Sequence, residues 1–110
     1  MSDLLSQKCR PLEGQPPMNE GAIRDHLALV SGWRFDAGAI EKAYLFGDFH
    51  ATISFVNALA WVCNTEDHHP DLAVSYGRCA VRFSTHSVGG VSINDFICAA
   101  KADALVALVG

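Results

Sequence analysis

Two stretches of alternating apolar and polar residues flank Gly77-Arg78 and predict a β-hairpin. Alternation with a period of two places the larger apolar side chains on one face of a sheet. These side chains are Leu72, Val74 and Tyr76 before the turn, and Cys79, Val81 and Phe83 after it. Glycine can take the positive φ that the first central residue of a type II′ turn requires. Counting outward from this turn pairs Tyr76 with Cys79 and predicts an antiparallel sheet.

The same register predicts that histidines meet at the open end of the hairpin. Continuing the count pairs His69 with His86, and His68 is adjacent in sequence. Directly opposed residues have Cβ atoms roughly 5 Å apart. Imidazole exists in both protonation states near neutrality, so converging histidines can supply a general acid and a general base. We therefore predict that His68, His69 and His86 are catalytic.

A metal site is the competing interpretation of three histidines, since zinc and iron both bind imidazole. Adjacent histidines project in different directions, and no carboxylate or cysteine falls at a familiar ligand spacing, so we expect no metal. The chain also lacks a Cys-x-x-Cys pair. We expect reduced thiols packed as small apolar side chains at Cys9, Cys63, Cys79 and Cys98.

The remaining patterns predict three helices and two further strands. A helix over 20–31 follows the N-cap Asn19, and strands over 33–35 and 40–46 are joined across Ala37-Gly38. The last helix begins at Ser92, with Asp95 placed three residues on as in a capping box. The residues of this helix expected to face inward are Ile93, Phe96, Ile97, Ala100 and Leu108.

The second helix, from the N-cap Asp48 to about residue 64, is apolar on two sides. One stripe contains Phe49, Thr52, Ile53, Val56, Ala60 and Cys63, and the other contains Phe55, Leu59 and Val62. A chain this short has few elements with which to cover both stripes. We therefore expect one side of this helix to pack against another subunit.

Composition indicates one globular domain of 110 residues, of which 50% are hydrophobic and 18% charged. A net charge of −4 without a run of Lys or Arg argues against direct binding to nucleic acid or anionic membranes. Residues 1–18 are predicted to be a flexible arm, and residues 19–110 a single domain. The arm lacks the apolar core of a signal peptide and no stretch is suited to span a bilayer, so we expect a cytoplasmic protein.

Several short motifs along the chain are specific in combination. The most specific are Asp-His-His-Pro-Asp at 67–71, Ser-Thr-His at 84–86 and Gly-Gly-Val-Ser at 89–92, with Tyr76 and Asp95. Together these motifs resemble the pterin-4a-carbinolamine dehydratase family. The resemblance extends over nearly the whole chain through Gly32-Trp33, Phe-Gly-Asp-Phe at 46–49, Lys8-Cys9 and Pro16-Pro17. The combined pattern is specific, although His-His-Pro alone is weak.

This resemblance implies an α+β fold with the order α-β-β-α-β-β-α, in which helices pack on one face of a four-stranded antiparallel sheet. It implies a homodimer or homotetramer with helices at the subunit contact, which would account for the second apolar stripe. It also implies a 4a-hydroxytetrahydrobiopterin dehydratase, a lyase that uses no metal and no bound cofactor. Such an enzyme converts 4a-hydroxytetrahydropterin to quinonoid dihydropterin and water, recycling tetrahydrobiopterin used by aromatic amino-acid hydroxylases.

The family's site histidines correspond to His68, His69 and His86. The predicted register favours His69 and His86 as the acid/base pair, with His68 orienting the pterin. The resemblance also implies a set of substrate-binding candidates, the last of them as a ring that stacks near the pterin: Asp67, Ser84, Thr85, Ser87 and Trp33.

The chain departs from the family pattern at two positions. Many relatives carry Glu where this chain has Asn64, four residues before the first site histidine. Asparagine can orient an imidazole but adds no charge, so we expect optimum activity at lower pH than in a Glu-bearing relative. Leu12 stands where some bacterial relatives have a second Cys after Cys9, so no redox or metal role is expected for the arm.

Two other functions remain open. Members of this family also serve as dimerisation partners of a homeodomain transcription factor, so a diverged copy could be a regulatory binding module without catalysis. A role in the maturation of molybdopterin enzymes would keep the pocket and change the ligand. Retention of three histidines favours the enzyme, and Asn64 is the feature that keeps the binding module open.

Overall fold

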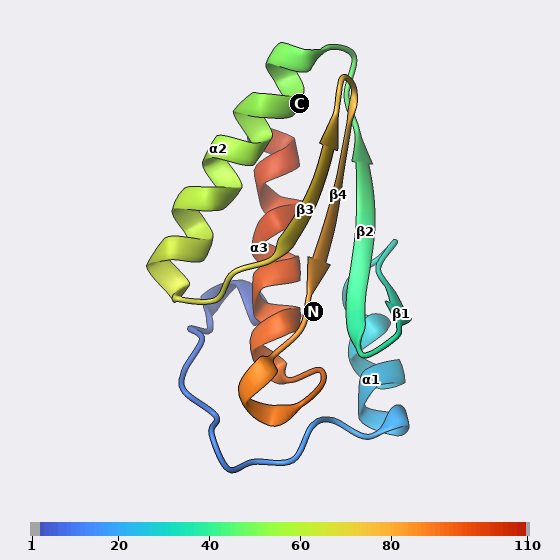
Figure 1. The fold of residues 1–110 in the computed structure, drawn as a ribbon, viewed down its shortest axis with the longest axis vertical. Coiled ribbons are helices and arrows are strands. Elements are labelled where there is room, and N and C mark those ends of the chain that lie inside the picture. Colours follow the sequence, from blue (N-terminus) through green and yellow to red (C-terminus); the bar gives the residue numbers. More distant parts are fainter. Residues whose placement is uncertain (1–2, 110) are drawn as a thin grey trace.

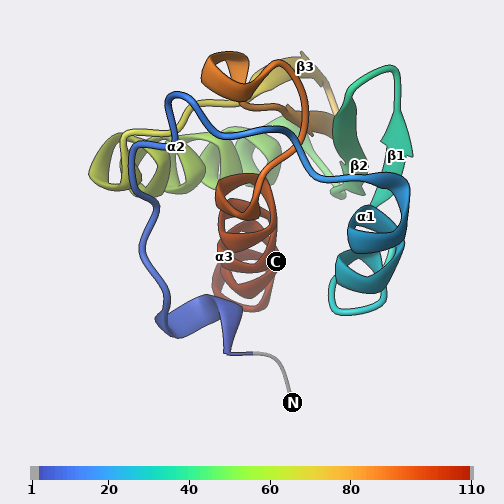
Figure 2. The same cartoon turned by 90° about the horizontal axis from the view of Figure 1, so that it is seen from below.

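The computed structural model describes residues 3–109, and its elements follow the predicted order. The helices are α1 (Glu20–Leu27), α2 (Phe49–Glu66) and α3 (Ile93–Val109), and the strands are β1 (Arg34–Asp36), β2 (Ala39–Leu45), β3 (Asp71–Ser75) and β4 (Arg78–Phe83). The strands form one antiparallel sheet in the order β1-β2-β4-β3, with the helices on one face (Figures 1 and 2). The predicted α+β fold is confirmed. None of the helices in the described part of the chain could cross a membrane.

The predicted N-caps start the helices where the sequence placed them. The side chain of Asn19 accepts a hydrogen bond from the amide of Ala22, and that of Asp48 accepts one from the amide of Ala51, each at 2.8 Å. Helix α1 ends at Leu27, four residues earlier than predicted, because turns occupy the residues that follow. The capping residues therefore predict where a helix begins more accurately than the sequence predicts where it ends.

The first two strands are joined as predicted but begin and end one residue away from the predicted positions. The connecting residues Ala37 and Gly38 have φ of 48° and 81°. Positive φ at both central residues is the pattern of a type I′ turn, whose twist matches that of the flanking strands. The β1–β2 hairpin is therefore closed by its turn residues.

The predicted register of the β3–β4 hairpin is wrong by two residues. Leu72 pairs with Val81 and Val74 with Cys79, so the turn residues are Tyr76 and Gly77. A shift of two residues leaves each side chain on its predicted face of the sheet, because the side-chain period is two. It removes the predicted pairing of His69 with His86, since the ladder ends before either residue.

Gly77 is required for a different reason from the one predicted. Neither of the two turn residues, Tyr76 and Gly77, has positive φ, so the turn is not of type II′. The carbonyl of Gly77 accepts a hydrogen bond of 2.8 Å from the amide of Phe46, and a Cβ at Gly77 would lie 2.7 Å from the Phe46 carbonyl oxygen. Close approach of the chain after β2 therefore selects glycine here.

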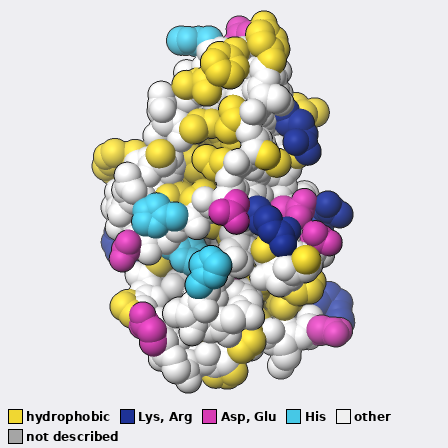
Figure 3. All heavy atoms as spheres, in the orientation of Figure 1, with side chains coloured by type: hydrophobic (Ala, Val, Ile, Leu, Met, Phe, Trp, Pro, Cys, Tyr) yellow, Lys and Arg dark blue, Asp and Glu magenta, His cyan; other side chains and the backbone are white. Residues whose placement is uncertain are grey.

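The buried side of α2 combines residues of both predicted stripes, among them Thr52 of the first stripe. Phe55, Leu59 and Cys63 are buried, whereas Phe49 of the first stripe is 49% exposed and Trp61 is 70% exposed. Strand β3, at the sheet edge, also exposes its apolar side chains. Figure 3 shows apolar side chains spread over this part of the surface.

The N-terminal arm places apolar side chains in the protein interior. Leu4, in the short 3-10 helix η1 (Leu4–Ser6), is 2% exposed, and Leu12 is 5% exposed. The amide of Met18 donates to the carbonyl of Val91 at 2.9 Å. The arm passes the loop between β4 and α3 before it reaches α1 (Figure 1). The inward orientation predicted for α3 holds at Phe96 and Ile97, and the side chain of Leu108 lies outside the described ones.

We predict that Gly77→Ala destabilises the fold while Gly47→Ala does not. A Cβ added at Gly77 would contact the backbone of Phe46, whereas a Cβ added at Gly47 would have no heavy atom within 4 Å. The free energy of unfolding is expected to fall by about 1–3 kcal/mol for Gly77→Ala and to change by less than about 0.5 kcal/mol for Gly47→Ala. Urea unfolding followed by circular dichroism measures both, and equal values would contradict the close-approach argument.

Candidate functional site

His68 is positioned by the way in which α2 ends. Asp67 takes the left-handed conformation with φ of 53°. The amide of His68 donates to the carbonyl of Cys63 at 3.1 Å, and that of Asp67 donates to the carbonyl of Asn64 at 3.2 Å. These are the bonds of a Schellman motif, which reverses the chain direction at the end of a helix. The reversal directs His68 back toward the start of α3.

The imidazole of His68 is held by a buried carboxylate. Its Nε2 lies 2.6 Å from Oδ1 of Asp95, which is fully buried. The other oxygen of Asp95 accepts hydrogen bonds from Thr85 Oγ1 at 2.8 Å and from the Ser92 amide at 2.9 Å. Because a carboxylate only accepts, Nε2 of His68 donates, and in the neutral ring Nδ1 is then the free acceptor.

The other two predicted histidines lie nearer the surface. His69 is exposed, and its Nε2 is 3.0 Å from Oδ1 of Asn64 on α2. His86 is exposed in the short 3-10 helix η2 (His86–Val88), which follows β4. Figure 3 shows histidine side chains close together near the middle of one face, below the apolar surface, and another histidine apart from them at the upper end. Within residues 3–109 no group of three or more His, Cys, Asp or Glu is arranged to hold a metal ion.

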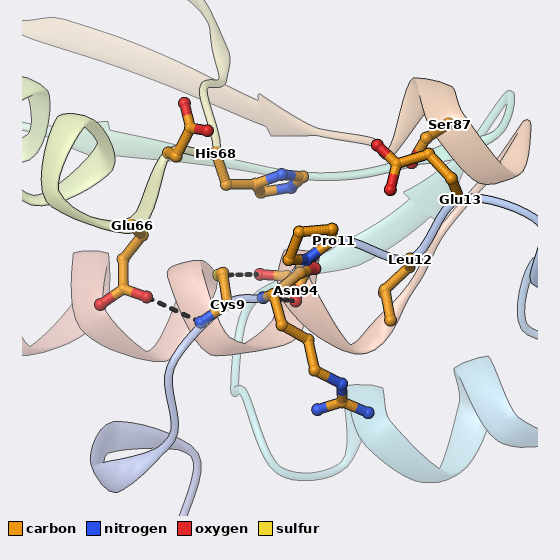
Figure 4. A pocket seen from close by; sticks show the side chains of 10 residues that line it. Cys9, Pro11, Leu12, Glu13, Glu66, His68, Ser87 and Asn94 are labelled. Atoms are coloured by element: carbon orange, nitrogen blue, oxygen red, sulfur yellow. Dashed lines mark hydrogen bonds between the residues drawn. The ribbon is translucent and has the colours of Figure 1, made fainter.

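A cavity of about 220 Å³ opens beside His68 (Figure 4). Residues 9–13 of the arm form one wall, residues 66–68 at the end of α2 form another, and Ser87 and Asn94 complete it. The ring of His68 lies across from Pro11 and extends toward Ser87 and Glu13. The arm is therefore part of the cavity.

Backbone hydrogen bonds to two buried side chains hold the arm against the helices. Asn94 accepts from the Arg10 amide at 3.2 Å and donates to the Arg10 carbonyl at 2.7 Å. Glu66 accepts from the Cys9 amide at 2.8 Å and pairs with Lys101 at 2.7 Å. Although burial raises it, the Lys101 and Cys9 hydrogen bonds hold the pKa of Glu66 below its ordinary value.

The predicted substrate-binding residues have different surroundings. Asp67 and Ser87 line the cavity, Ser84 is half-buried at the end of β4, and Thr85 is buried in the Asp95 network. The structure does not bring Trp33 to this cavity.

Trp33 is 6% exposed and lies in a separate polar cluster. Its indole N–H and the hydroxyl of Tyr44 both donate to Asp103, the latter at 2.5 Å, and Lys42 pairs with the same carboxylate at 2.9 Å. Burial, together with the bond to Asp103, raises the pKa of Tyr44. Trp33 is thus a core aromatic residue in this structure.

Sequence reasoning did not identify Asp95, Asn94 and Glu66 as parts of the site. Asp95 was interpreted as a helix-end carboxylate, and it does accept from the Ser92 amide, as a capping box requires. The same carboxylate also holds His68. Asn94 and Glu66 lie among other polar residues of α3 and α2, so no local sequence signal distinguishes them.

Comparisons with known proteins assign this chain to one family. The family model described as Pterin 4 alpha carbinolamine dehydratase matches residues 16–105. A candidate pterin-4-alpha-carbinolamine dehydratase of Chromobacterium violaceum is 47% identical over 94% of this chain and 95% of its own length. A protein of the same name from Stenotrophomonas maltophilia is 48% identical over 96% of each chain.

Solved structures have the same fold. The transcriptional coactivator/pterin dehydratase from Brucella melitensis superposes with a TM-score of 0.79 and 29% identity, covering 82% of this chain and 98% of that one. A pterin dehydratase-like protein, identified as a RuBisCO assembly factor in the alpha-carboxysome, has a TM-score of 0.60. At 22% identity over 68% of this chain and 89% of its own, it shows the fold alone.

We predict that Thr85→Val weakens the fold through the buried network. The substitution keeps the side-chain shape but removes a hydroxyl that donates to Asp95. Loss of a donor to a buried carboxylate is expected to lower the free energy of unfolding by about 1–3 kcal/mol. The matched control Thr65→Val, on the exposed side of α2, should change it by less than about 0.5 kcal/mol. A Thr85→Val protein as stable as the control in urea would show that the network is not stabilising.

Proposed function

Because the chain belongs to the pterin-4-alpha-carbinolamine dehydratase family, we propose that it converts 4a-hydroxytetrahydropterin to quinonoid dihydropterin and water. The observation that carries the proposal is the His68–Asp95 pair beside a cavity. Dehydration needs one proton delivered to the departing hydroxyl at C4a and one removed from N5. Imidazoles can do both near neutral pH. The pathway we propose is the recycling of tetrahydrobiopterin.

We assign His68 as the base that takes the N5 proton through Nδ1. Asp95 fixes the ring tautomer and faces the positive charge that forms when the ring is protonated, as a carboxylate does in a catalytic triad. His86 is assigned as the acid for the departing hydroxyl, and His69, held by Asn64, orients the pterin. This assignment replaces the His69–His86 acid/base pair, because the register that favoured that pair does not form.

Asp67 and Ser87 are the substrate-binding candidates that the cavity supports best, because both line it. Thr85 is proposed to act indirectly, through its bond to Asp95. Ser84 stays a candidate for backbone contact with the pterin. Trp33 is not retained as a substrate-binding candidate, because its surroundings are those of a core residue.

The decisive test is the decay rate of enzymatically generated 4a-hydroxytetrahydropterin with chelator-treated protein. We expect strong acceleration by the wild type and a loss of about 100-fold or more in His68→Ala and in His86→Ala. His50→Ala, an exposed histidine at the start of α2, is the matched control and should retain the wild-type rate. Folded wild-type protein that gives no acceleration would rule out the dehydratase.

A second prediction concerns Asn64→Glu. A carboxylate beside His69 favours its protonated form, so the limb of the pH–rate profile that depends on His69 should move to higher pH. Thr65→Glu adds the same charge at the neighbouring, exposed position and should leave that limb in place. Coincident profiles for wild type and Asn64→Glu would contradict a functional contact between Asn64 and His69.

A regulatory binding module is the second candidate function. The exposed apolar side of α2 favours it, and the Brucella melitensis relative is named both as a coactivator and as a dehydratase. A catalytically inactive wild type that still associates through this side would support the module over the enzyme.

We also propose that copies of this chain associate through α2 and β3 as a homodimer or homotetramer. Trp61 and Tyr76 are 70% and 67% exposed, and Tyr76 stacks on Phe49, which is itself 49% exposed. Grouped apolar surface of this kind is typical of a subunit contact. Light scattering should give a dimer or tetramer mass for the wild type and a smaller mass for Trp61→Glu. Leu29→Glu, an exposed apolar residue away from α2, is the control and should keep the wild-type mass. A monomeric wild type would contradict the proposal.

A further inference from the structure

Three cysteines from separate segments meet behind the arm wall of the cavity. Cys9 Sγ, on the arm, lies 3.5 Å from Cys98 Sγ on α3. Cys98 in turn hydrogen-bonds Cys63 on α2, which lowers the pKa of Cys63. The sequence indicated no redox role for the arm because residue 12 is Leu. The structure supplies the second thiol from α3.

The three thiols differ in their access to solvent. Cys9 is half-buried and lines the cavity, whereas Cys63 and Cys98 are 1% and 0% exposed. All are free thiols. A small solute in the cavity can therefore reach Cys9 and cannot reach the other two. This is the arrangement of an accessible thiol backed by a sheltered partner.

We propose that Cys9 is an oxidation site for hydrogen peroxide and that Cys98 resolves the product to a disulfide. The Cys9 thiolate attacks one peroxide oxygen, the O–O bond breaks, and hydroxide leaves, giving Cys9 sulfenic acid. Cys98 sulfur then attacks Cys9 sulfur, and the hydroxyl departs with the Cys98 proton as water. Peroxide is reduced to water and the two thiols are oxidised. The two sulfur atoms lie 3.5 Å apart and must approach by about 1.5 Å to reach the disulfide length of about 2.05 Å.

The surroundings of Cys98 indicate which step is slower. Hydrogen bonds to Cys63 and Cys9, together with burial, raise the pKa of Cys98. A thiol that resists deprotonation attacks slowly. We therefore expect Cys9 sulfenic acid to persist before the disulfide forms, so that dimedone can trap it.

The disulfide would fix the arm in place beside His68. It joins residues 89 apart in sequence, so it restricts the unfolded chain strongly. The urea midpoint of the oxidised protein should therefore rise, and it should return to its original value on reduction. This proposal does not depend on the dehydratase reaction.

The test is treatment of the full chain with hydrogen peroxide, then alkylation of remaining thiols and peptide mass spectrometry. We expect a linked peptide pair containing Cys9 and Cys98. Dimedone added with the peroxide should label Cys9, and the label should increase in Cys98→Ser, where the second step is blocked. Cys79→Ser removes a buried thiol of β4 outside the cluster and should leave the cross-link unchanged.

Two results would overturn the proposal. One is Cys9 that remains fully alkylatable after peroxide treatment of folded protein. The other is a wild-type cross-link that joins Cys63 to Cys98 and leaves Cys9 free, which would place the reaction at the buried thiols. Circular dichroism of each variant establishes that it is folded, and dimedone labelling of wild-type Cys9 keeps the test decisive if Cys98→Ser does not fold.

Discussion

The buried carboxylate of Asp95 connects the segments from which the site is built. One carboxylate oxygen accepts hydrogen bonds from the amide of Ser92 at the start of α3 and from the hydroxyl of Thr85 after β4. The other faces the imidazole of His68, which follows α2. A buried charge is tolerated only where hydrogen bonds replace those of water. The same bonds that stabilise the helix start therefore also fix the orientation of a catalytic candidate.

Local chemistry made most of the fold predictable. Asn19 and Asp48 cap helices through their own side chains, and alternation assigned each side chain of the β3–β4 hairpin to the correct face. The register was not predictable, because Gly77 is selected by a backbone contact with Phe46 from another part of the chain. The inward side of α2 was equally ambiguous, since both of its stripes are apolar.

The site was predictable in its residues more than in its geometry. His68 was identified from its motif, but its partner Asp95 lies 27 residues away and carries a sufficient local explanation as a cap. The cavity wall was not foreseen, because it is held mainly by backbone groups of the arm. Any residue type can offer a backbone amide or carbonyl, so contacts such as that of Arg10 with Asn94 leave little trace in a sequence pattern.

The cavity wall formed by residues 9–13 of the arm is less stable than the parts of the cavity formed by the helices. The sheet and α3 contribute the fully buried core, whereas residues 9–13 are attached by a few hydrogen bonds and one buried leucine. Segments attached in this way open by local fluctuations that leave the rest of the protein folded. Solvent and small molecules can then exchange with the space beside His68 without any movement of α2, which His68 follows, or of α3, which carries Asp95.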